Sequence, residues 1–149
     1  MESDFRGREG VQKLLDSKKS NQFDYITASF IVIHREVVNK IGYFYEKYFM
    51  YYEDVDYCIR ADKNGFSMKK ISIDSFRHKE SSSLGKNSKA HNYYLARNHM
   101  LLVERLAPLS VKLYEFIRLP KTLYEFYSTK NSGALDGMRD YLFRKFGKY

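Results

Sequence analysis

The chain has 149 residues, 44% of them hydrophobic, which suits one folded domain of ordinary size and excludes a disordered chain. The formal net charge of +8 favours anionic partners, and the single cysteine, Cys58, excludes an internal disulfide and a cluster of thiolate zinc ligands. The first ten residues carry charges throughout and no continuous apolar segment, so we expect neither a secretory signal nor a spanning helix there, and a cytoplasmic protein.

The first 89 residues predict alternating helices and strands. In chain order we expect a short helix and a loop over residues 1–22, a buried strand over 25–33, a helix over 34–41, a helix over 53–65, a strand over 66–73 and a loop over 74–89. The first strand is predicted because its run is apolar, β-branched and nearly uncharged. Gly42 and Gly65 delimit the two longer helices at their C-terminal ends.

The remaining residues predict helices only. We expect, in order, a helix over residues 91–106, a helix from Pro108 to Leu119, an interruption at Pro120, an apolar segment ending near Tyr127, a turn over 131–133 and a basic amphipathic helix over 134–149. Pro120 is expected to break its helix because proline lacks the amide proton that a helix interior uses. The predicted fold class is therefore α/β, mixed α+β, with a few strands followed by several C-terminal helices.

An acidic run at residues 53–56 directly follows an aromatic run at residues 48–52. Carboxylates grouped in this way suit a general base or the oxygen ligands of a divalent cation. Acids in the first turn of a helix also favour the positive end of the helix dipole without any further role. Because burying rings beside charged groups is costly, the aromatic neighbours favour a functional role for the acids.

Several short motifs in this region resemble the second half of inverting family 2 glycosyltransferases. In matching order and spacing, they are residues 26–30, 35–38, 41–44, 49–60 and 65–66. Residues 93–98 resemble the helix that follows the active site in the rhamnosyltransferase-like branch, which builds bacterial surface polysaccharides. Linked motifs in register are more specific than one short pattern.

The resemblance implies a role for each residue around the acidic run. Asp54 would be the catalytic base, with Glu53 beside it, and would take the proton of the acceptor hydroxyl during an inverting transfer. Tyr52 is expected to bind substrate as part of an aromatic platform for a sugar. Asp56 imitates a metal-binding Asp-x-Asp pattern, but it is expected to help fix the loop, because the family places that motif earlier in the chain.

Two further groups of residues are implied to bind substrate or metal. His78 falls where several family members place a histidine that completes the coordination of a divalent metal, Mn²⁺ or Mg²⁺; the alternative is a loop histidine without a ligand. Arg77 and Lys79 are expected to close over the diphosphate of a nucleotide sugar, or to belong to an ordinary solvated loop. Arg97 and Asn98 are expected to brace the acceptor side, or only to pack their helix.

The resemblance also divides the chain. Residues 1–107 would be the acceptor-side part of a GT-A type catalytic domain, and residues 108–149 a basic helical extension. Only about two dozen residues precede the strand expected at Tyr25, too few for the nucleotide-binding half, because one βαβ unit needs roughly 30 residues or more. We therefore expect little or no transferase activity from this chain alone. We also expect a homo-oligomer, since an unpaired sheet edge favours self-association.

Rival functions follow from the C-terminal third. Four aromatic residues and the basic tail suggest a non-catalytic module that docks on a partner or on an anionic membrane, at the inner face of the plasma membrane: Tyr114, Phe116, Tyr124 and Phe126. The alternative for this segment is a packed helical cap. Membrane docking is compatible with an enzyme whose acceptor is a glycan on a lipid. Nucleic acid is not expected as a partner, because the basic residues are dispersed and no nucleic-acid motif accompanies them.

Overall fold

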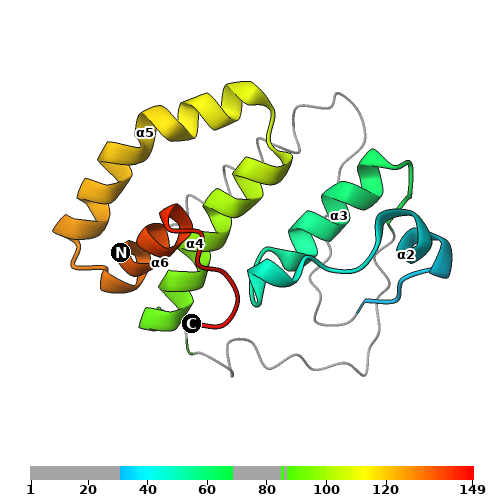
Figure 1. Cartoon of the computed structure of the whole chain (residues 1–149), viewed down its shortest axis with the longest axis horizontal. Coiled ribbons are helices and arrows are strands. Elements are labelled where there is room, and N and C mark those ends of the chain that lie inside the picture. The colour runs from blue at the N-terminus through cyan, green and yellow to red at the C-terminus, as the bar shows by residue number, and fades with distance from the viewer. Residues whose placement is uncertain (1–30, 69–84, 86) are drawn as a thin grey trace.

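The computed structural model describes residues 31–68, 85 and 87–149 (Figure 1). Their elements are α2 (Arg35–Ile41), the 3₁₀ helix η1 (Glu46–Tyr48), α3 (Glu53–Lys63), α4 (Lys89–Leu106), α5 (Leu109–Ser128) and α6 (Ser132–Leu142). In Figure 1, α4 and α5 diverge from the turn that joins them, and α6 lies between their far ends. The helices α2 and α3 form the other side of the molecule.

The described residues form helices and no strand, so the predicted α/β class is wrong. The described ends of the two predicted strands, residues 31–33 and 66–68, have no regular structure. Val32 is 82% exposed, whereas a strand covered on both faces would bury it. A short apolar run is compatible with several structures, and it becomes a strand only where a neighbour pairs with it. The rest of both segments lies outside the described residues.

Most of the predicted helices are confirmed. α2 ends at Gly42, which has a φ of +75° and donates its amide proton to the Val38 carbonyl. α3 begins at Glu53, as the acidic first turn predicts, and α4 extends the predicted helix by two residues at its start. The boundary predicted at residue 107 coincides with the turn between α4 and α5 and is otherwise untested.

The predicted interruption at Pro120 is wrong, because α5 runs through this residue from Leu109 to Ser128. Pro120 lies on the exposed side of the helix. The carbonyl that loses its helical partner there faces outward rather than into the core, which lowers the cost of the missing bond. The last helix, α6, is shorter than predicted and ends at Leu142.

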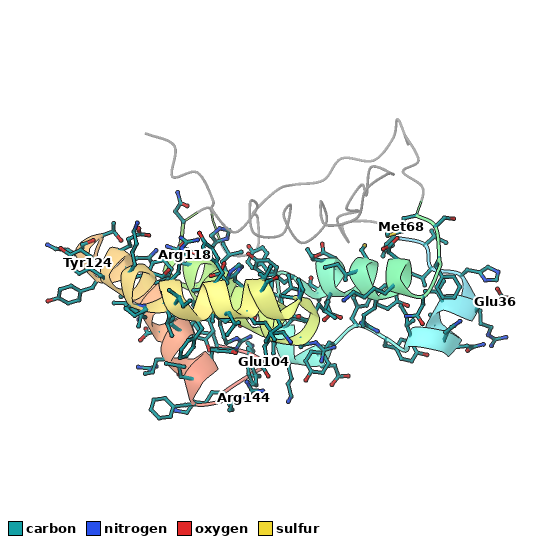
Figure 2. All side chains as sticks on the ribbon, turned by 90° about the horizontal axis from the view of Figure 1, so that it is seen from above. Glu36, Met68, Glu104, Arg118, Tyr124 and Arg144 are labelled. Carbon is teal, nitrogen blue, oxygen red and sulfur yellow. The ribbon has the colours of Figure 1, made fainter. Side chains whose placement is uncertain are left out.

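Two glycines let α6 approach α4 closely. A Cβ atom added to Gly133 would lie 2.2 Å from the Lys89 carbonyl oxygen, and one added to Gly137 would lie 2.3 Å from that of Tyr93. Distances this short occur only where a helix backbone rests directly on another. After α6 the tail returns along α4, and Arg144 pairs with Glu104 (Figure 2).

The core lies where α3 and α4 meet the loop before α3. Its buried members are Tyr48, Tyr52, Val55, Ile59, Leu101 and Leu102, and Phe146 of the tail packs against them. In the part of the chain that the structure describes, no helix is long and apolar enough to cross a membrane.

Candidate functional site

The loop of residues 43–52 enters α3 through a strained backbone. Phe49, Tyr51 and Tyr52 have φ angles of 62°, 65° and 72°. Bulky residues rarely adopt these left-handed conformations, and each costs on the order of 1–3 kcal/mol. Such strain persists only where surrounding groups hold the backbone, and it concentrates at functional sites.

Two buried side chains of α4, Arg97 and Asn98, hold this loop. The Asn98 amide nitrogen lies within hydrogen-bond distance of three loop carbonyl oxygens, those of Tyr48 (2.9 Å), Met50 (2.7 Å) and Tyr51 (3.0 Å). Arg97 donates to the Tyr48 carbonyl at 2.9 Å, and its Nε donates to the Asn98 side-chain oxygen at 3.0 Å. The two residues thus anchor the loop backbone to α4.

The predicted substrate contacts of Arg97 and Asn98 stay predictions. The two residues are 1% and 0% exposed, and Arg97 also donates to the Gly147 carbonyl of the tail at 2.8 Å. Their hydrogen bonds go to the protein itself, so the role that the structure shows for them is to position the loop and the N-terminus of α3.

The predicted acid pair occupies the first turn of α3. Tyr52 is the N-cap of the helix and supplies no side-chain hydrogen bond there, and Glu53 and Asp54 follow it. The Asp54 carboxylate accepts a hydrogen bond of 2.8 Å from the Val55 amide and is largely buried. Both acids lie at the positive end of the helix dipole. The hydrogen bond from the Val55 amide fixes the orientation of the Asp54 carboxylate.

The surroundings of Glu53 disfavour the ionised form of its carboxyl group. Its Oε2 atom is buried and has no hydrogen-bond partner among the described residues. Burial raises the pKa of the Glu53 carboxyl, a backbone hydrogen bond acts in the opposite direction, and the nearby Asp54 charge raises the pKa further. Two adjacent carboxyl groups with different surroundings are typical of acid–base sites.

Asp56 serves the structure instead of binding a metal. It is fully buried, and it accepts hydrogen bonds from the Tyr48 hydroxyl (3.1 Å), Arg60 Nε (2.6 Å) and Arg105 Nε (2.9 Å). Arg60 also donates to the carbonyls of Ile41 and, at 2.8 Å, Tyr43. Asp56 therefore ties α3 to the preceding loop and to α4, in agreement with the role predicted for it.

A cavity of about 590 Å³ opens between α4, α5 and α6. Tyr52, the residue immediately before Glu53, lines it. The polar lining residues are Asn87, Asn92, His99, Glu115, Arg118, Thr122, Glu125, Thr129 and Asn131. Apolar side chains with a few polar groups among them are the usual lining of a small-molecule site, and this cavity is richer in polar groups than most.

The charged groups of the cavity centre on Glu115. His99 Nε2 lies 3.7 Å from the Glu115 carboxylate, and the nearby His99 ring lowers the pKa of Glu115. Burial acts in the opposite direction, and the charge of Arg118 makes a smaller lowering contribution. The other ring nitrogen of His99, Nδ1, is buried without a hydrogen-bond partner among the described residues. The Tyr52 ring stands edge-on to the His99 ring, with centroids 6.2 Å apart.

Three predicted site residues, Arg77, His78 and Lys79, lie outside the described residues, so their roles stay predictions. No group of three or more His, Cys, Asp or Glu side chains that could hold a metal ion occurs within residues 31–68, 85 and 87–149. The described part of the chain therefore contains an acidic helix start and a polar cavity, and within it no such group of metal ligands.

The polar cavity was not predicted from the sequence, in which no motif marks His99, Glu115 or Arg118 as site residues. One signal was available, because Glu115 and Arg118 interrupt the otherwise apolar stretch of residues 113–119. Charged residues on one side of such a helix indicate either solvent or a polar cavity, and only the packing of α5 over α4 shows which.

Comparison with known proteins gives one informative similarity. The chain is 25% identical over 113 residues to "Low-salt glycan biosynthesis hexosyltransferase Agl10" of Haloferax volcanii. The match covers 74% of this chain and 37% of the relative, so the chain spans little more than a third of that protein's length. No family model and no solved structure matches the chain. The similarity supports the glycosyltransferases in general as the class of protein.

Proposed function

We propose that this chain is the base-bearing and acceptor-binding part of an inverting, family 2-like glycosyltransferase. It would act on a nucleotide sugar as donor and on a glycan or lipid-linked glycan as acceptor. One observation carries the proposal: Tyr52, which lines the polar cavity, is also the N-cap of α3, so the acidic first turn of that helix begins directly after a cavity residue. The similarity to a hexosyltransferase supports the reaction class. The resemblance to the rhamnosyltransferase-like branch supports a surface polysaccharide as the product.

In the proposed reaction, Asp54 is the general base. Its carboxylate takes the proton of an acceptor hydroxyl while that oxygen attacks the anomeric carbon of the donor sugar. The bond from this carbon to the phosphate oxygen breaks as the new bond forms, and the nucleoside diphosphate leaves with the electron pair. Attack from the face opposite the leaving group inverts the configuration.

The cavity is the proposed acceptor site. Tyr52 offers a ring face or edge to a sugar, and the carboxylate of Glu115 and the guanidinium of Arg118 offer an acceptor and donors for hydroxyl groups. A sugar bound there would lie against the residue that precedes the acid pair. Holding the acceptor hydroxyl close to its base is worth several kcal/mol of the reaction barrier.

A divalent metal is a further part of the proposal and rests on the resemblance alone. Asp56 is engaged by three protein donors and does not suit metal coordination. His78 would complete the coordination of a metal that supplies charge neutralisation on the diphosphate. The proton transfer assigned to Asp54 needs no participation of that metal.

Substitution of the base tests the proposal. The assay uses the full-length protein purified from its host, a panel of nucleotide hexoses as donors and the host's lipid-linked glycans as acceptors. We expect Asp54→Asn to lower kcat by about 10²–10⁴-fold, because a neutral amide cannot accept the proton. The KM for acceptor should change little. Asp62→Asn, two turns further along α3, is the matched control and should retain activity. Full activity of the Asp54 variant would contradict the assignment.

A further inference from the structure

The helix α5 has its hydrophobic pattern turned outward. A surface helix of a globular protein normally buries its apolar side and exposes its charged side. None of the 20 residues of α5 is buried, and its exposed side consists of large hydrophobic residues: Leu109, Leu113, Phe116, Ile117, Tyr124 and Tyr127. We name these six residues the α5 stripe. Their exposed fractions run from 53% to 75%.

The α5 stripe is continuous along the helix. At 3.6 residues per turn its members fall within an arc of roughly 100°, and Pro120 lies in the same arc. No charged residue lies within this arc. Contiguous exposed apolar patches are rare on soluble monomers and mark sites of interaction.

The polar side of α5 is directed inward. Glu115, Arg118, Thr122 and Glu125 line the cavity between α4, α5 and α6. Phe126, which the sequence analysis grouped with the docking aromatics, lines the cavity as well. The two carboxylates of α5, those of Glu115 and Glu125, therefore lie outside the α5 stripe. The charged residues at the borders of the stripe are cationic.

Two lysines border the α5 stripe, one on each side. By the same helical geometry, Lys112 lies one turn from Phe116 and just outside one edge of the α5 stripe. Lys121 lies one turn from Ile117 and just outside the other edge. Lysines at the edges of an apolar surface extend their ammonium groups toward lipid headgroups while their stems stay in apolar contact. Tyrosine, present in the stripe at two positions, is enriched where membrane meets water.

The C-terminal segment does not share this role. Gly133, Ala134, Gly137 and Met138 of α6 pack against α4, and Arg144 is paired with Glu104. The basic tail is tied to α4 by the pair of Arg144 with Glu104, and its exposed apolar residues are limited to Leu142, Phe143 and Tyr149, whereas α5 has a continuous exposed apolar side. Figure 2 shows α5 along the near side of the molecule, with Tyr124 toward its outer end.

We propose that α5 lies in the plane of an anionic lipid bilayer, with the α5 stripe among the acyl chains and Lys112 and Lys121 at the headgroups. An amphipathic helix with these features binds at the interface without crossing the membrane. The lysines favour an anionic surface over a second copy of the chain as the occupant, because a second α5 stripe would bring two more lysines and no carboxylate to the contact. This inference does not depend on the proposed catalytic role.

A single tryptophan tests the placement of the stripe, because the chain has no natural tryptophan. The tryptophan serves as a fluorescent reporter. Phe116→Trp places it in the exposed α5 stripe, and Phe126→Trp places it at a residue that lines the cavity. With vesicles that contain phosphatidylglycerol and brominated lipids, we expect a blue shift and strong quenching of Trp emission for the first variant. For the second we expect neither.

Two double variants and a control separate the apolar contribution to vesicle affinity from the contribution of the lysine charges. Phe116→Ser with Ile117→Ser should lower vesicle affinity by more than tenfold with unchanged helix content by circular dichroism. Lys112→Gln with Lys121→Gln should lower it roughly thirtyfold on anionic vesicles. Lys40→Gln with Lys148→Gln removes the same net charge at exposed positions outside α5 and should have a much smaller effect.

Three results would overturn the inference. One is the absence of quenching in the Phe116→Trp variant on anionic vesicles, and another is equal quenching at both reporter positions. The third is a dimer in sedimentation velocity that the double serine variant dissociates, with no vesicle binding by the parent chain. That outcome would assign the α5 stripe to contacts between copies of the chain.

Discussion

At the scale of single residues, Glu53 carries the clearest sign of function, because its carboxyl is held where its charge is poorly solvated. One of its oxygens is buried with no hydrogen-bond partner among the described residues, and burial raises the pKa. A buried polar group without a partner costs about 1–3 kcal/mol. Carboxyl groups with a perturbed pKa cluster at functional sites, which supports the role proposed for Glu53 beside Asp54.

The raised pKa of Glu53 predicts a pH dependence of stability. The unfolded chain releases this proton near the ordinary value of 4.5, and the folded chain releases it at higher pH. At a pH between these two pKa values, the folded state binds more protons than the unfolded state. The Glu53 carboxyl therefore contributes stability at low pH that is lost as the pH rises through the folded-state pKa. Glu53→Gln removes the effect. Relative to the parent chain, the variant should therefore gain free energy of unfolding between pH 4 and pH 8.

Urea unfolding at a series of pH values measures this difference. Glu46→Gln, in the exposed part of η1, is the control and should show no gain between the two pH values. A constant difference between the Glu53 variant and the parent at all pH values would show that the folded and unfolded pKa values of Glu53 are the same.

At the scale of elements, the contact between α4 and α6 depends on two glycines. Gly137 fits because its Cα lies against the backbone of α4, where a Cβ atom would meet the Tyr93 carbonyl oxygen at 2.3 Å. The opposing atoms belong to a helix backbone, so they cannot move aside as a flexible side chain would. The spacing of Gly133 and Gly137, with three residues between them, is the sequence signal of this contact.

Gly137→Ala should therefore destabilise the protein, although alanine is the better helix former. The helix preference for alanine is worth about 1 kcal/mol. Overpacking against a rigid backbone costs about 1–3 kcal/mol, and here it displaces a whole helix, so we expect a net loss of about 2 kcal/mol in the free energy of unfolding. Thermal unfolding of the variant beside Ser132→Ala, an exposed position on the same helix, gives the measurement. Equal stability of the two variants would refute this account of the contact.

Local signals predicted the helices well and failed where the outcome depends on neighbours. Gly42 and the acids at residues 53–54 delimit α2 and α3, because the preference for a cap or a first-turn charge acts within one turn. Pro120 has a strong local preference against a helix interior, but α5 continues through it on the exposed side. The inward direction of Glu115 likewise depends on where α4 lies, which no local pattern contains.

At the scale of the whole molecule, polar contacts over long sequence separations join α3 and its loop to α4. Asp56 accepts a hydrogen bond from Arg105, and Lys63 donates to the Leu106 carbonyl at 3.0 Å. Such contacts explain why the fold class was predicted wrongly although the start of α3 at Glu53 was predicted correctly. The acid pair is a local motif, whereas the described helices are assembled by partners about 50 residues apart that a sequence pattern does not connect.

Asn98 offers the sharpest test of this long-range assembly. It is fully buried and serves three carbonyl groups of the strained loop. In Asn98→Ala the carbonyls of Met50 and Tyr51 lose this donor, whereas that of Tyr48 keeps the hydrogen bond from Arg97. Each buried polar group left unpaired costs about 1–3 kcal/mol, and we expect a loss of about 3 kcal/mol in the free energy of unfolding because part of the loop can relax toward water. Asn92→Ala, on the same helix at the cavity wall, should cost less than about 0.5 kcal/mol.

The Asn98 variant also distinguishes anchoring from simple packing. If Asn98 anchors the loop, amide hydrogen exchange in Asn98→Ala should accelerate first at residues 48–54, where the strained loop leads into the acid pair, before it changes in α6. A side chain that only fills space would loosen its own helix, and exchange would then rise mainly in α4 while the loop kept its protection. Early loss of protection in the loop would mean that α4 sets the position of Asp54 from 44 residues away in the chain, so that the geometry of the base is a property of the whole fold.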